Sequence, residues 1–312
     1  MPLLGTAGMH GMSMGHEPAV NLHNLLTQWL VSPFAFGVLV ACVAAAAWYI
    51  NATARLQARG RHWPWPRTAA FLGGLLCVEL ALGSSVATYA GYTFTAHVIQ
   101  HLLLMVAAPP LAALGAPMTL LLQTSKRPTK RRILTALHSR VFRLISHALP
   151  VFFLYYLSMY AFFLTAAIGY AMTHMWLMDL INLGFLAGST LFWWPMVGVD
   201  PIPRGRMNPG FKIINLLIGV PVESFLGIAL MSMARPAAPM YSLQSTHTGG
   251  AVLWAASEAA TLLATVPIYL EWVRSDARAA KRIDARLDAG EAVVTAPEGY
   301  GMAATFRALR RG

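Results

Sequence analysis

Two histidines one helical turn apart are the first residues in this sequence whose spacing suggests chemistry. His97 and His101 are separated by four positions, so on a helix their imidazole rings lie on one face. Two rings placed in this way can bind one metal ion, as paired helix histidines do in zinc enzymes. The same pair could instead relay protons with Glu79 or Glu258, or pack as core histidines, because this spacing alone is a weak motif.

The beginning of the chain is rich in methionine and histidine. The run MHGMSMGHE contains Met9, His10, Met12, Met14 and His16. Thioether and imidazole together favour Cu(I), whereas zinc sites usually include thiolate or carboxylate. Methionine often fills gaps in apolar cores, but a polar, glycine-rich segment is a poor candidate for such packing. The run therefore predicts copper capture.

Long apolar stretches must position these residues. The chain has 312 residues, of which 57% are hydrophobic and 11% charged, whereas roughly a quarter of a soluble domain is charged. A run of about 20 apolar residues crosses a bilayer core. Seven such runs are present, at about 31–50, 69–88, 97–122, 150–170, 176–198, 211–233 and 250–272. We predict an all-α polytopic integral membrane protein whose seven-helix membrane domain covers residues 31–273.

The positive charge predicts the orientation of these spans. The net charge is +11, yet all but one of the 23 Lys and Arg residues fall in alternate loops and in the C-terminal tail. Cytoplasmic loops hold the positive charge of membrane proteins. We therefore expect residues 1–30 outside and the basic tail, 274–312, in the cytoplasm, with the protein in a bacterial inner (plasma) membrane. The expected partner of this charge is a lipid bilayer and not nucleic acid.

Ionisable residues within the predicted spans and at their outer ends are further candidates. A charge at the centre of a membrane helix costs about 2.5–3.5 kcal/mol on insertion scales, so such residues are functional candidates by default. Four acidic residues fall within spans: Glu79, Asp179, Glu223 and Glu258. They could also serve only as hydrogen-bonding contacts between helices. At the outer ends, His174 and His247 accompany several methionines and add candidate copper ligands.

Prolines interrupt the third apolar run. Pro109, Pro110 and Pro117 cannot donate the backbone hydrogen bonds that continue a helix, so we expect this span to be kinked or locally unwound. After the seventh run, the sequence SDARAAKRIDARLD predicts a charged helix that continues out of the membrane.

Several blocks in a fixed order are more specific than any of these motifs. The blocks are AHVIQHLLLMVAAPPLAALGAP (96–117), LFWWPMVGVDPIPR (191–204), FLGIALM (225–231), GGAVLWAASE (249–258) and EWVRSDARAAKRIDARLD (271–288). Together they resemble the CtaG family of cytochrome c oxidase assembly factors, over well more than half of the chain. The resemblance implies seven spans and a role in maturing the copper-containing haem–copper oxidase.

The resemblance also matches particular residues to family positions. These are His97, Gln100, His101, Trp193, Trp194, Pro195, Asp200, Pro201, Pro203, Gly249, Gly250, Trp254 and Glu258. The chain departs from the family pattern in the fifth and sixth spans, where many members have histidine and this chain has Asn182 or Gly184 and Val222 or Glu223. It departs again just before the double glycine, where an Asp-Gln pair is replaced by Thr246-His247-Thr248. Asp179, Glu223 and His247 are candidate replacements.

The sequence therefore predicts an assembly factor, not an enzyme, that binds Cu(I) and delivers it from the extracytoplasmic side to a cytochrome c oxidase subunit. The alternative is a membrane permease for copper or another small solute, with Glu79, Glu223 and the broken third span along its path. A third possibility is an intramembrane oxidoreductase with haem or quinone. The close histidine pair lies on one helix, which is the wrong geometry for bis-histidine haem ligation.

Overall fold

The computed structural model describes residues 22–200 and 208–288, and every regular element within these two ranges is a helix. The elements are α1 (Leu22–Thr27), α2 (Pro33–Ala58), α3 (Trp65–Leu82), α4 (Ser85–Ala90), α5 (Phe94–Leu102), η1 (Leu103–Ala107), α6 (Ala108–Leu114), α7 (Pro117–Thr124), α8 (Arg127–Leu137), α9 (Arg140–Ile145), α10 (Ala148–Phe163), α11 (Ala167–Met172), α12 (Met175–Val197), α13 (Pro209–Met231) and α14 (Leu243–Asp288). The predicted all-α class is confirmed for these residues. The predicted helix beyond the seventh run is confirmed as well, because α14 continues unbroken to Asp288.

Within the described ranges, six segments are long and apolar enough to cross a membrane. They are Pro33–Ala58, Trp65–Leu82, Phe94–Thr124, Met175–Val197, Pro209–Met231 and Leu243–Ala285. The remaining predicted span corresponds to α10, an apolar helix of 16 residues. It is shorter than predicted because the chain bends at residues 164–166 before α11 begins.

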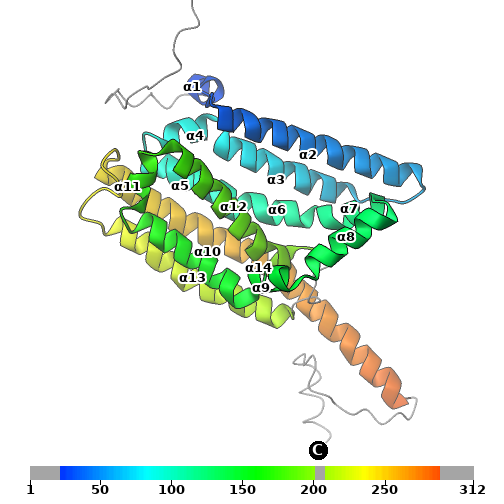
Figure 1. The fold of residues 1–312 in the computed structure, drawn as a ribbon. Coiled ribbons are helices and arrows are strands. Elements are labelled where there is room, and N and C mark those ends of the chain that lie inside the picture. The colour runs from blue at the N-terminus through cyan, green and yellow to red at the C-terminus, as the bar shows by residue number, and fades with distance from the viewer. Residues whose placement is uncertain (1–21, 201–207, 289–312) are drawn as a thin grey trace, which may run out of the picture.

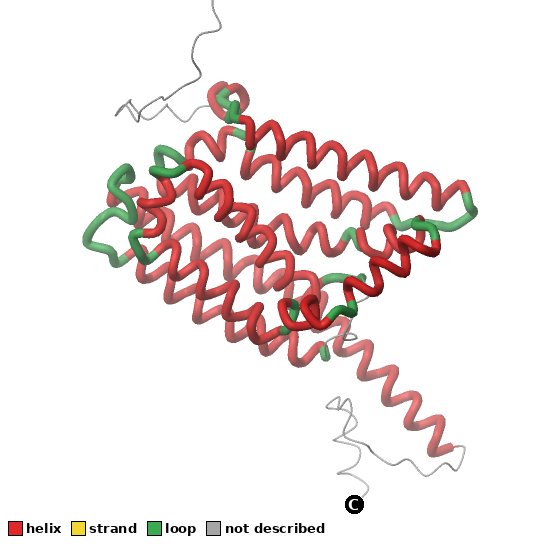
Figure 2. Tube along the Cα trace, viewed as in Figure 1, coloured by secondary structure: helices red, strands yellow, loops and turns green. Residues whose placement is uncertain are grey.

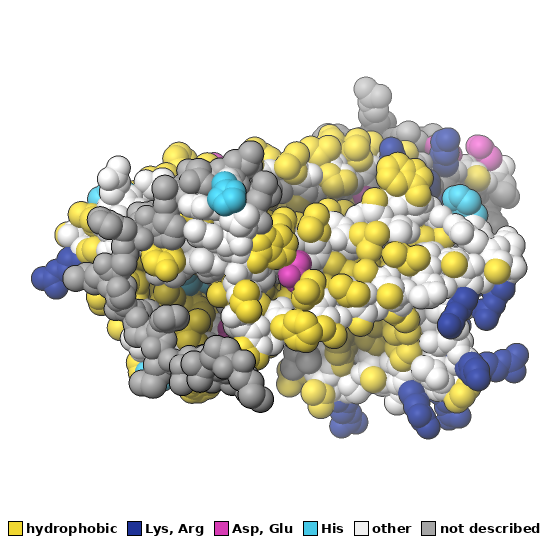
Figure 3. Space-filling model, turned by 90° about the horizontal axis from the view of Figure 1, so that it is seen from above, with side chains coloured by type: hydrophobic (Ala, Val, Ile, Leu, Met, Phe, Trp, Pro, Cys, Tyr) yellow, Lys and Arg dark blue, Asp and Glu magenta, His cyan; other side chains and the backbone are white. Residues whose placement is uncertain are grey.

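The helices pack side by side in one bundle, and the connecting loops gather towards its two ends (Figures 1 and 2). Helix α1 lies at one end, and the last turns of α14 extend from the opposite end (Figure 1). Large apolar side chains face outwards, including Phe36, Phe153 and Leu263, which are 67%, 62% and 75% exposed. In Figure 3, hydrophobic side chains cover the middle of the visible face, and Lys and Arg gather mainly towards one end. An apolar exterior of this kind is suited to lipid.

The third membrane segment changes helix type where its prolines occur. Helix α5 continues into the π-helical turn η1 and then into α6, which contains Pro109 in its first turn. Pro109 has no N–H to donate to the carbonyl four residues earlier, which belongs to Met105. The indole Nε1 of Trp193 on α12 donates to that carbonyl oxygen at 2.8 Å. A side chain from another helix thus replaces the missing backbone donor, and the predicted break is confirmed.

A second break separates α6 from α7. Ala116 adopts a left-handed conformation with φ of 52°, which is costly for a residue with a Cβ atom. The Tyr49 hydroxyl of α2 donates to the Gly115 carbonyl at 2.6 Å. The Asp200 carboxylate accepts hydrogen bonds from the first two free amides of α7 at 3.1 and 2.7 Å. Contacts from distant parts of the chain therefore hold this strained connection in place.

Two adjacent glycines bring α14 against two neighbouring helices. A Cβ atom on Gly249 would lie 2.5 Å from a ring carbon of Phe94 on α5. A Cβ atom on Gly250 would lie 2.9 Å from the carbonyl oxygen of Gly227 on α13. Small residues of this kind let helix backbones approach closely in membranes. The double glycine thus fixes the position of α5 relative to α14.

Candidate metal site: a buried histidine pair

Helix α5 carries both histidines and is held by contacts on several sides. Backbone amides of its first turn donate to the hydroxyl oxygens of Thr93 and of Ser245, the latter on α14. The side-chain amide of Gln100 donates to a backbone carbonyl of α3 at 2.8 Å. Because these contacts fix the rotation of α5 about its axis, His97 and His101 point into the bundle.

The two imidazole rings meet inside the protein. Nε2 of His97 and Nε2 of His101 are 2.9 Å apart, and the ring centroids are 4.7 Å apart. Each residue is only 1% exposed. The pair shares one helix face, as its spacing predicts, and it is enclosed by other side chains.

Tyr241, in the loop between α13 and α14, orients the first of these rings. Its hydroxyl oxygen is 2.8 Å from the Ala90 carbonyl oxygen and 2.9 Å from Nδ1 of His97. A hydroxyl carries one proton and a carbonyl can only accept, so Tyr241 donates to Ala90 and the Nδ1–H of His97 donates to Tyr241. Burial raises the pKa of Tyr241, which keeps this proton on the hydroxyl.

These hydrogen bonds determine the tautomers of both histidines. With its proton on Nδ1, His97 has a lone pair on Nε2. The 2.9 Å contact between the two Nε2 atoms then requires that His101 donates from its own Nε2. The lone pair of His101 is consequently on Nδ1, which is buried and has no hydrogen-bond partner among the described residues. The pair is a hydrogen-bonded unit with one unsatisfied nitrogen.

Aromatic rings from two other helices surround His101. The ring centroids of Phe162 and Phe163 on α10 lie 5.2 and 5.4 Å from that of His101, and Phe185 on α12 lies at 4.9 Å. These rings exclude water and leave the imidazole nitrogens in apolar surroundings. Electrostatic interactions are stronger in such an environment than in water.

The donor set of this site favours a soft ion. Among the described residues, no group of three or more His, Cys, Asp and Glu is placed to hold a metal, so the site differs from a zinc centre with three or four such ligands. Neutral imidazoles suit soft or borderline metal ions, and hard ions prefer oxygen. The thioether sulfur of Met172 lies 3.6 Å from the Tyr241 hydroxyl oxygen.

None of the hydrogen bonds given by the structure joins the four acidic residues predicted within spans to the histidine pair, and two of the four, Glu223 on α13 and Glu258 on α14, are close enough to interact electrostatically. Glu258 accepts a hydrogen bond from the Ser224 hydroxyl at 2.7 Å, which joins α14 to α13. Glu79 and Glu223 each have one buried carboxyl oxygen without a hydrogen-bond partner in the described part of the chain, and Asp179 is partly buried on α12. The hydrogen bonds that the structure gives the histidine pair lead to Tyr241 and not to Glu79 or Glu258.

The remaining predicted ligands do not join the pair. Nδ1 of His174 is 3.1 Å from the carbonyl oxygen of Tyr170, and Nε2 of His247 is 2.9 Å from that of Met233. Both rings therefore bond to nearby backbone. The other predicted ligands lie outside the described residues: Met9, His10, Met12, Met14 and His16.

Sequence reasoning missed Tyr241, the residue that positions His97. No motif marks it, and it is 144 positions away from His97 in the chain. The sequence marks Tyr241 only indirectly. It lies in the loop before α14, the helix that contains the block GGAVLWAASE, and the first glycine of this block packs against α5.

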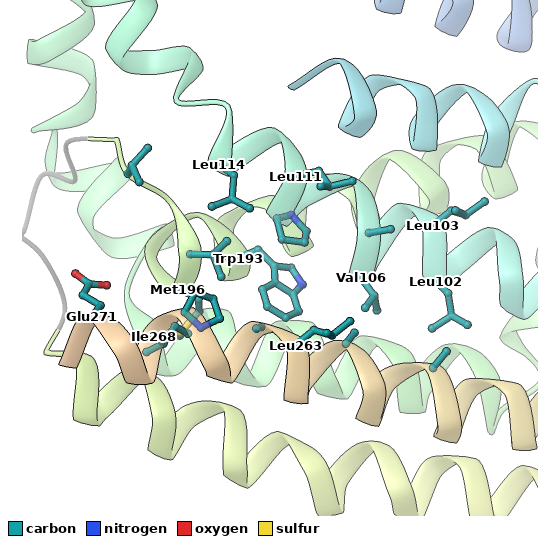
Figure 4. Close-up of a pocket in the computed structure, with 18 of the residues that line it drawn as sticks. Leu102, Leu103, Val106, Leu111, Leu114, Trp193, Met196, Leu263, Ile268 and Glu271 are labelled. Atoms are coloured by element: carbon teal, nitrogen blue, oxygen red, sulfur yellow. The ribbon is translucent and has the colours of Figure 1, made fainter. Parts of the chain in front are cut away.

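An apolar cavity of about 650 Å³ lies between α6, α12 and α14. Trp193 forms part of its wall, with Leu111 of α6 and Leu263 of α14 around it (Figure 4). Glu271 lies at one end of the cavity, where its carboxylate is 3.4 Å from the ammonium nitrogen of Lys212. Among the residues that the structure describes, Glu271 is the only ionisable one that lines the cavity.

The six long apolar segments among the described residues indicate a multi-pass membrane protein. The sequence model of the cytochrome c oxidase caa3 assembly factor family (Caa3_CtaG) matches residues 47–275. This range includes the histidine pair, Tyr241 and both breaks of the third segment. The chain belongs to this family.

Similar proteins occur in mycobacteria. Uncharacterized proteins of Mycobacterium bovis and Mycobacterium tuberculosis are each 32% identical over 264 residues, which cover 79% of this chain and 40% of theirs. An uncharacterized protein of Mycobacterium leprae is 32% identical over 259 residues, 77% of this chain and 39% of its own. The chain thus spans well under half the length of these relatives. No solved structure matches it.

Proposed function

We propose that this protein is an assembly factor for haem–copper cytochrome c oxidase that binds Cu(I) as cargo at His97 and His101. Membership of the assembly factor family supports the role in oxidase maturation. The observation that carries the copper site is the 2.9 Å approach of two buried Nε2 atoms. The protein acts by binding and transfer, without catalytic turnover.

The pair fits such an ion in donor type. Its two Nε2 atoms are joined by a hydrogen bond of 2.9 Å, and an ion with two metal–nitrogen bonds of about 2.0 Å holds its nitrogens farther apart, so binding would replace this hydrogen bond and move the rings apart. A histidine that binds a metal donates its other N–H to a fixed acceptor, which orients the ring, and Tyr241 is that acceptor for His97. His101 can bind through Nε2 once its proton has moved to Nδ1, the atom that lacks a partner.

We further propose that the copper site faces the extracytoplasmic side of a bacterial inner membrane, in a protein with seven spans. Residues 1–30 would lie outside, and α10 would be the fourth span. The distribution of Lys and Arg supports this orientation. Helix α5 begins at the end of the bundle where α1 lies (Figure 1), so the histidine pair would be reached from the outside.

The Met/His-rich run at the N-terminus is proposed to capture Cu(I) before it reaches the pair. Replacing Met9, Met12 and Met14 together with Ser removes three thioether donors. We expect slower copper loading of the purified protein and an unchanged melting temperature. Unchanged loading would show that the run has no part in copper capture.

The proposed function is tested by removing the imidazoles. His97→Ala and His101→Ala should each abolish Cu(I) binding to the purified protein and lower the copper content and activity of the oxidase in membranes. His101→Phe is a second variant that keeps the ring volume among Phe162, Phe163 and Phe185. It should fold normally and still fail to bind copper.

The matched control is His62→Ala, which removes an exposed histidine from a loop. It should leave copper binding and oxidase maturation unchanged, and the membrane abundance of every variant is measured in parallel. Normal oxidase activity in the His97/His101 double variant would exclude this site.

One observation favours the permease as the second candidate. Lys212, Asn215 and Glu223 occupy the buried face of α13, and a carboxyl oxygen of Glu223 and the amide oxygen of Asn215 have no partner among the described residues. Polar groups inside a bundle can line a path for a solute. Net Cu(I) uptake by proteoliposomes, lost in Glu223→Gln, would favour the permease, whereas binding without uptake would favour the assembly factor.

A further inference from the structure

A groove between α10 and α12 is not used by the copper site. It has a volume of about 560 Å³ and is lined partly by small residues, Ala161 on α10 and Gly184, Ala187 and Gly188 on α12. Leu154 of α10 also lines it, and this side chain is 55% exposed. The groove therefore opens towards the hydrocarbon region that surrounds the bundle.

The glycines in this groove leave space that the chain itself does not fill. A Cβ atom placed on Gly184 or Gly188 would meet nothing within 4 Å. The two residues are four positions apart and share one helix face. In membranes, small residues at this spacing let the backbone of a second helix approach closely. Their spacing thus indicates the kind of element that the groove accepts.

Two buried hydroxyl groups distinguish this groove from a lipid-facing surface. Tyr155 and Ser189 line it and are 1% and 0% exposed. Neither hydroxyl has a hydrogen-bond partner within the part of the chain that the structure describes. An unsatisfied polar group in hydrocarbon is costly, and an acyl chain has no donor or acceptor to offer. A polar side chain on a partner helix could satisfy both groups.

The groove lies next to the histidine pair. Phe162 and Phe185 line the groove, and the same two rings pack on His101 with centroid distances of 5.2 and 4.9 Å. Met105, one turn beyond His101 on the third segment, also lines it. An occupant of the groove would be separated from His101 by one layer of aromatic rings.

We propose that the α10–α12 groove binds a transmembrane helix of the oxidase subunit that this protein assists. The helix would carry small residues on its contacting face and a polar side chain directed at Tyr155 and Ser189. This inference rests on the proposed function and names the surface through which the partner is recognised. Docking there would bring the recipient of copper beside the histidine pair.

The test uses the full chain in its own membranes. A photo-crosslinking amino acid is placed at Ala187, which is exposed in the groove, and the crosslinked partner is identified by mass spectrometry. The groove is then filled by Gly184→Leu, which this chain can accommodate because no atom lies within 4 Å of the new Cβ. Gly37→Leu on α2 is the matched control, since Gly37 is equally unobstructed.

We expect a crosslink from position 187 to a membrane subunit of the oxidase. The crosslink and oxidase maturation should both be lost in Gly184→Leu and kept in Gly37→Leu, while Cu(I) binding by purified Gly184→Leu is unchanged. Crosslinking to a second copy of the chain, to lipid alone or to another membrane protein would overturn the inference, as would normal maturation with the groove filled. If a strain without this protein matures its oxidase normally, the proposed function fails, and the crosslink still identifies the occupant of the groove independently.

Discussion

At the scale of single residues, the proton on Tyr241 decides which nitrogen of His97 is free to bind an ion. The hydroxyl of Tyr241 accepts from Nδ1 of His97 at 2.9 Å and donates to the Ala90 carbonyl at 2.8 Å. Tyr241→Phe removes the acceptor and allows the proton of His97 to move to Nε2. Loss of such an outer hydrogen bond typically lowers metal affinity by about 10- to 100-fold. We expect a loss in this range for Cu(I), measured by competition with a chelator.

Tyr170→Phe provides the comparison for this variant. Tyr170 is 60% exposed, and its loss of a hydroxyl should not change copper affinity. Because a merely structural role of Tyr241 would lower stability, the melting temperature of both variants is measured as well. Equal affinity of Tyr241→Phe and the unchanged protein would show that the hydrogen bond does not position His97.

Sequence alone could predict the shared face of His97 and His101, because four-residue spacing is a local property of a helix. It could not predict their burial, which depends on Phe162, Phe163 and Phe185 from two other helices. The role of Tyr241 could not be predicted for the same reason, since Tyr241 and His97 are 144 positions apart in the chain.

At the scale of elements, the third segment depends on a side chain from α12. The indole of Trp193 donates at 2.8 Å to the Met105 carbonyl that Pro109 leaves without a donor. Trp193→Phe keeps most of the ring and removes this hydrogen bond. Leaving a buried carbonyl unsatisfied costs about 1–3 kcal/mol. We expect a loss of stability of this size in thermal or denaturant unfolding of the detergent-solubilised protein.

The adjacent tryptophan offers a control within the same helix. The indole nitrogen of Trp194 is buried and has no hydrogen-bond partner within the described residues. Trp194→Phe therefore removes an unsatisfied donor, and it should be neutral or stabilising. If both variants lost the same stability, packing of the rings and not the Met105 hydrogen bond would explain the effect.

The prolines made a break in this segment predictable, because their missing N–H groups are a property of the residues themselves. The left-handed conformation of Ala116 was not predictable, since that residue type does not favour a positive φ. It is held by Tyr49 and Asp200 from other parts of the chain. The family resemblance pointed to Asp200 but not to its role. Its carboxylate accepts hydrogen bonds from the first two free backbone amides of α7.

At the scale of the whole molecule, six of the seven predicted apolar runs coincide with described helices that are long and apolar enough to cross a membrane, and the run at 150–170 matches a helix only approximately. The predicted run 150–170 continues through the bend at 164–166, because residues on both sides of the bend are apolar. Hydropathy depends on composition and does not detect a bend in the backbone. The predicted run therefore extends beyond the end of α10. Helix α1 and the last turns of α14 lie at opposite ends of the bundle (Figure 1).

Orientation is the prediction on which the proposed outer location of the copper site depends. The 16 residues of α10 span about 24 Å at 1.5 Å per residue, somewhat less than a hydrocarbon core of about 30 Å. A short span of this kind can be accommodated by thinning of the bilayer at fractions of a kcal/mol per Å. If α10 did not cross, α12, α13 and α14 would be inverted. The eight Lys and Arg residues of the tail would then lie outside, against the usual distribution of positive charge.

Reporter fusions decide between these two arrangements. An enzyme that is active only outside the cytoplasm should be inactive after Gly312 and active when inserted at 91–93, the connection between α4 and α5 within the predicted outer loop 89–95. The same enzyme at Thr165, after α10, should also be active, because a crossing by α10 places this bend outside. An inactive reporter at Thr165 together with an active one after Gly312 would show that α10 does not cross. An inactive reporter at 91–93 would move the start of α5, and with it the entrance to His97 and His101, to the cytoplasmic side.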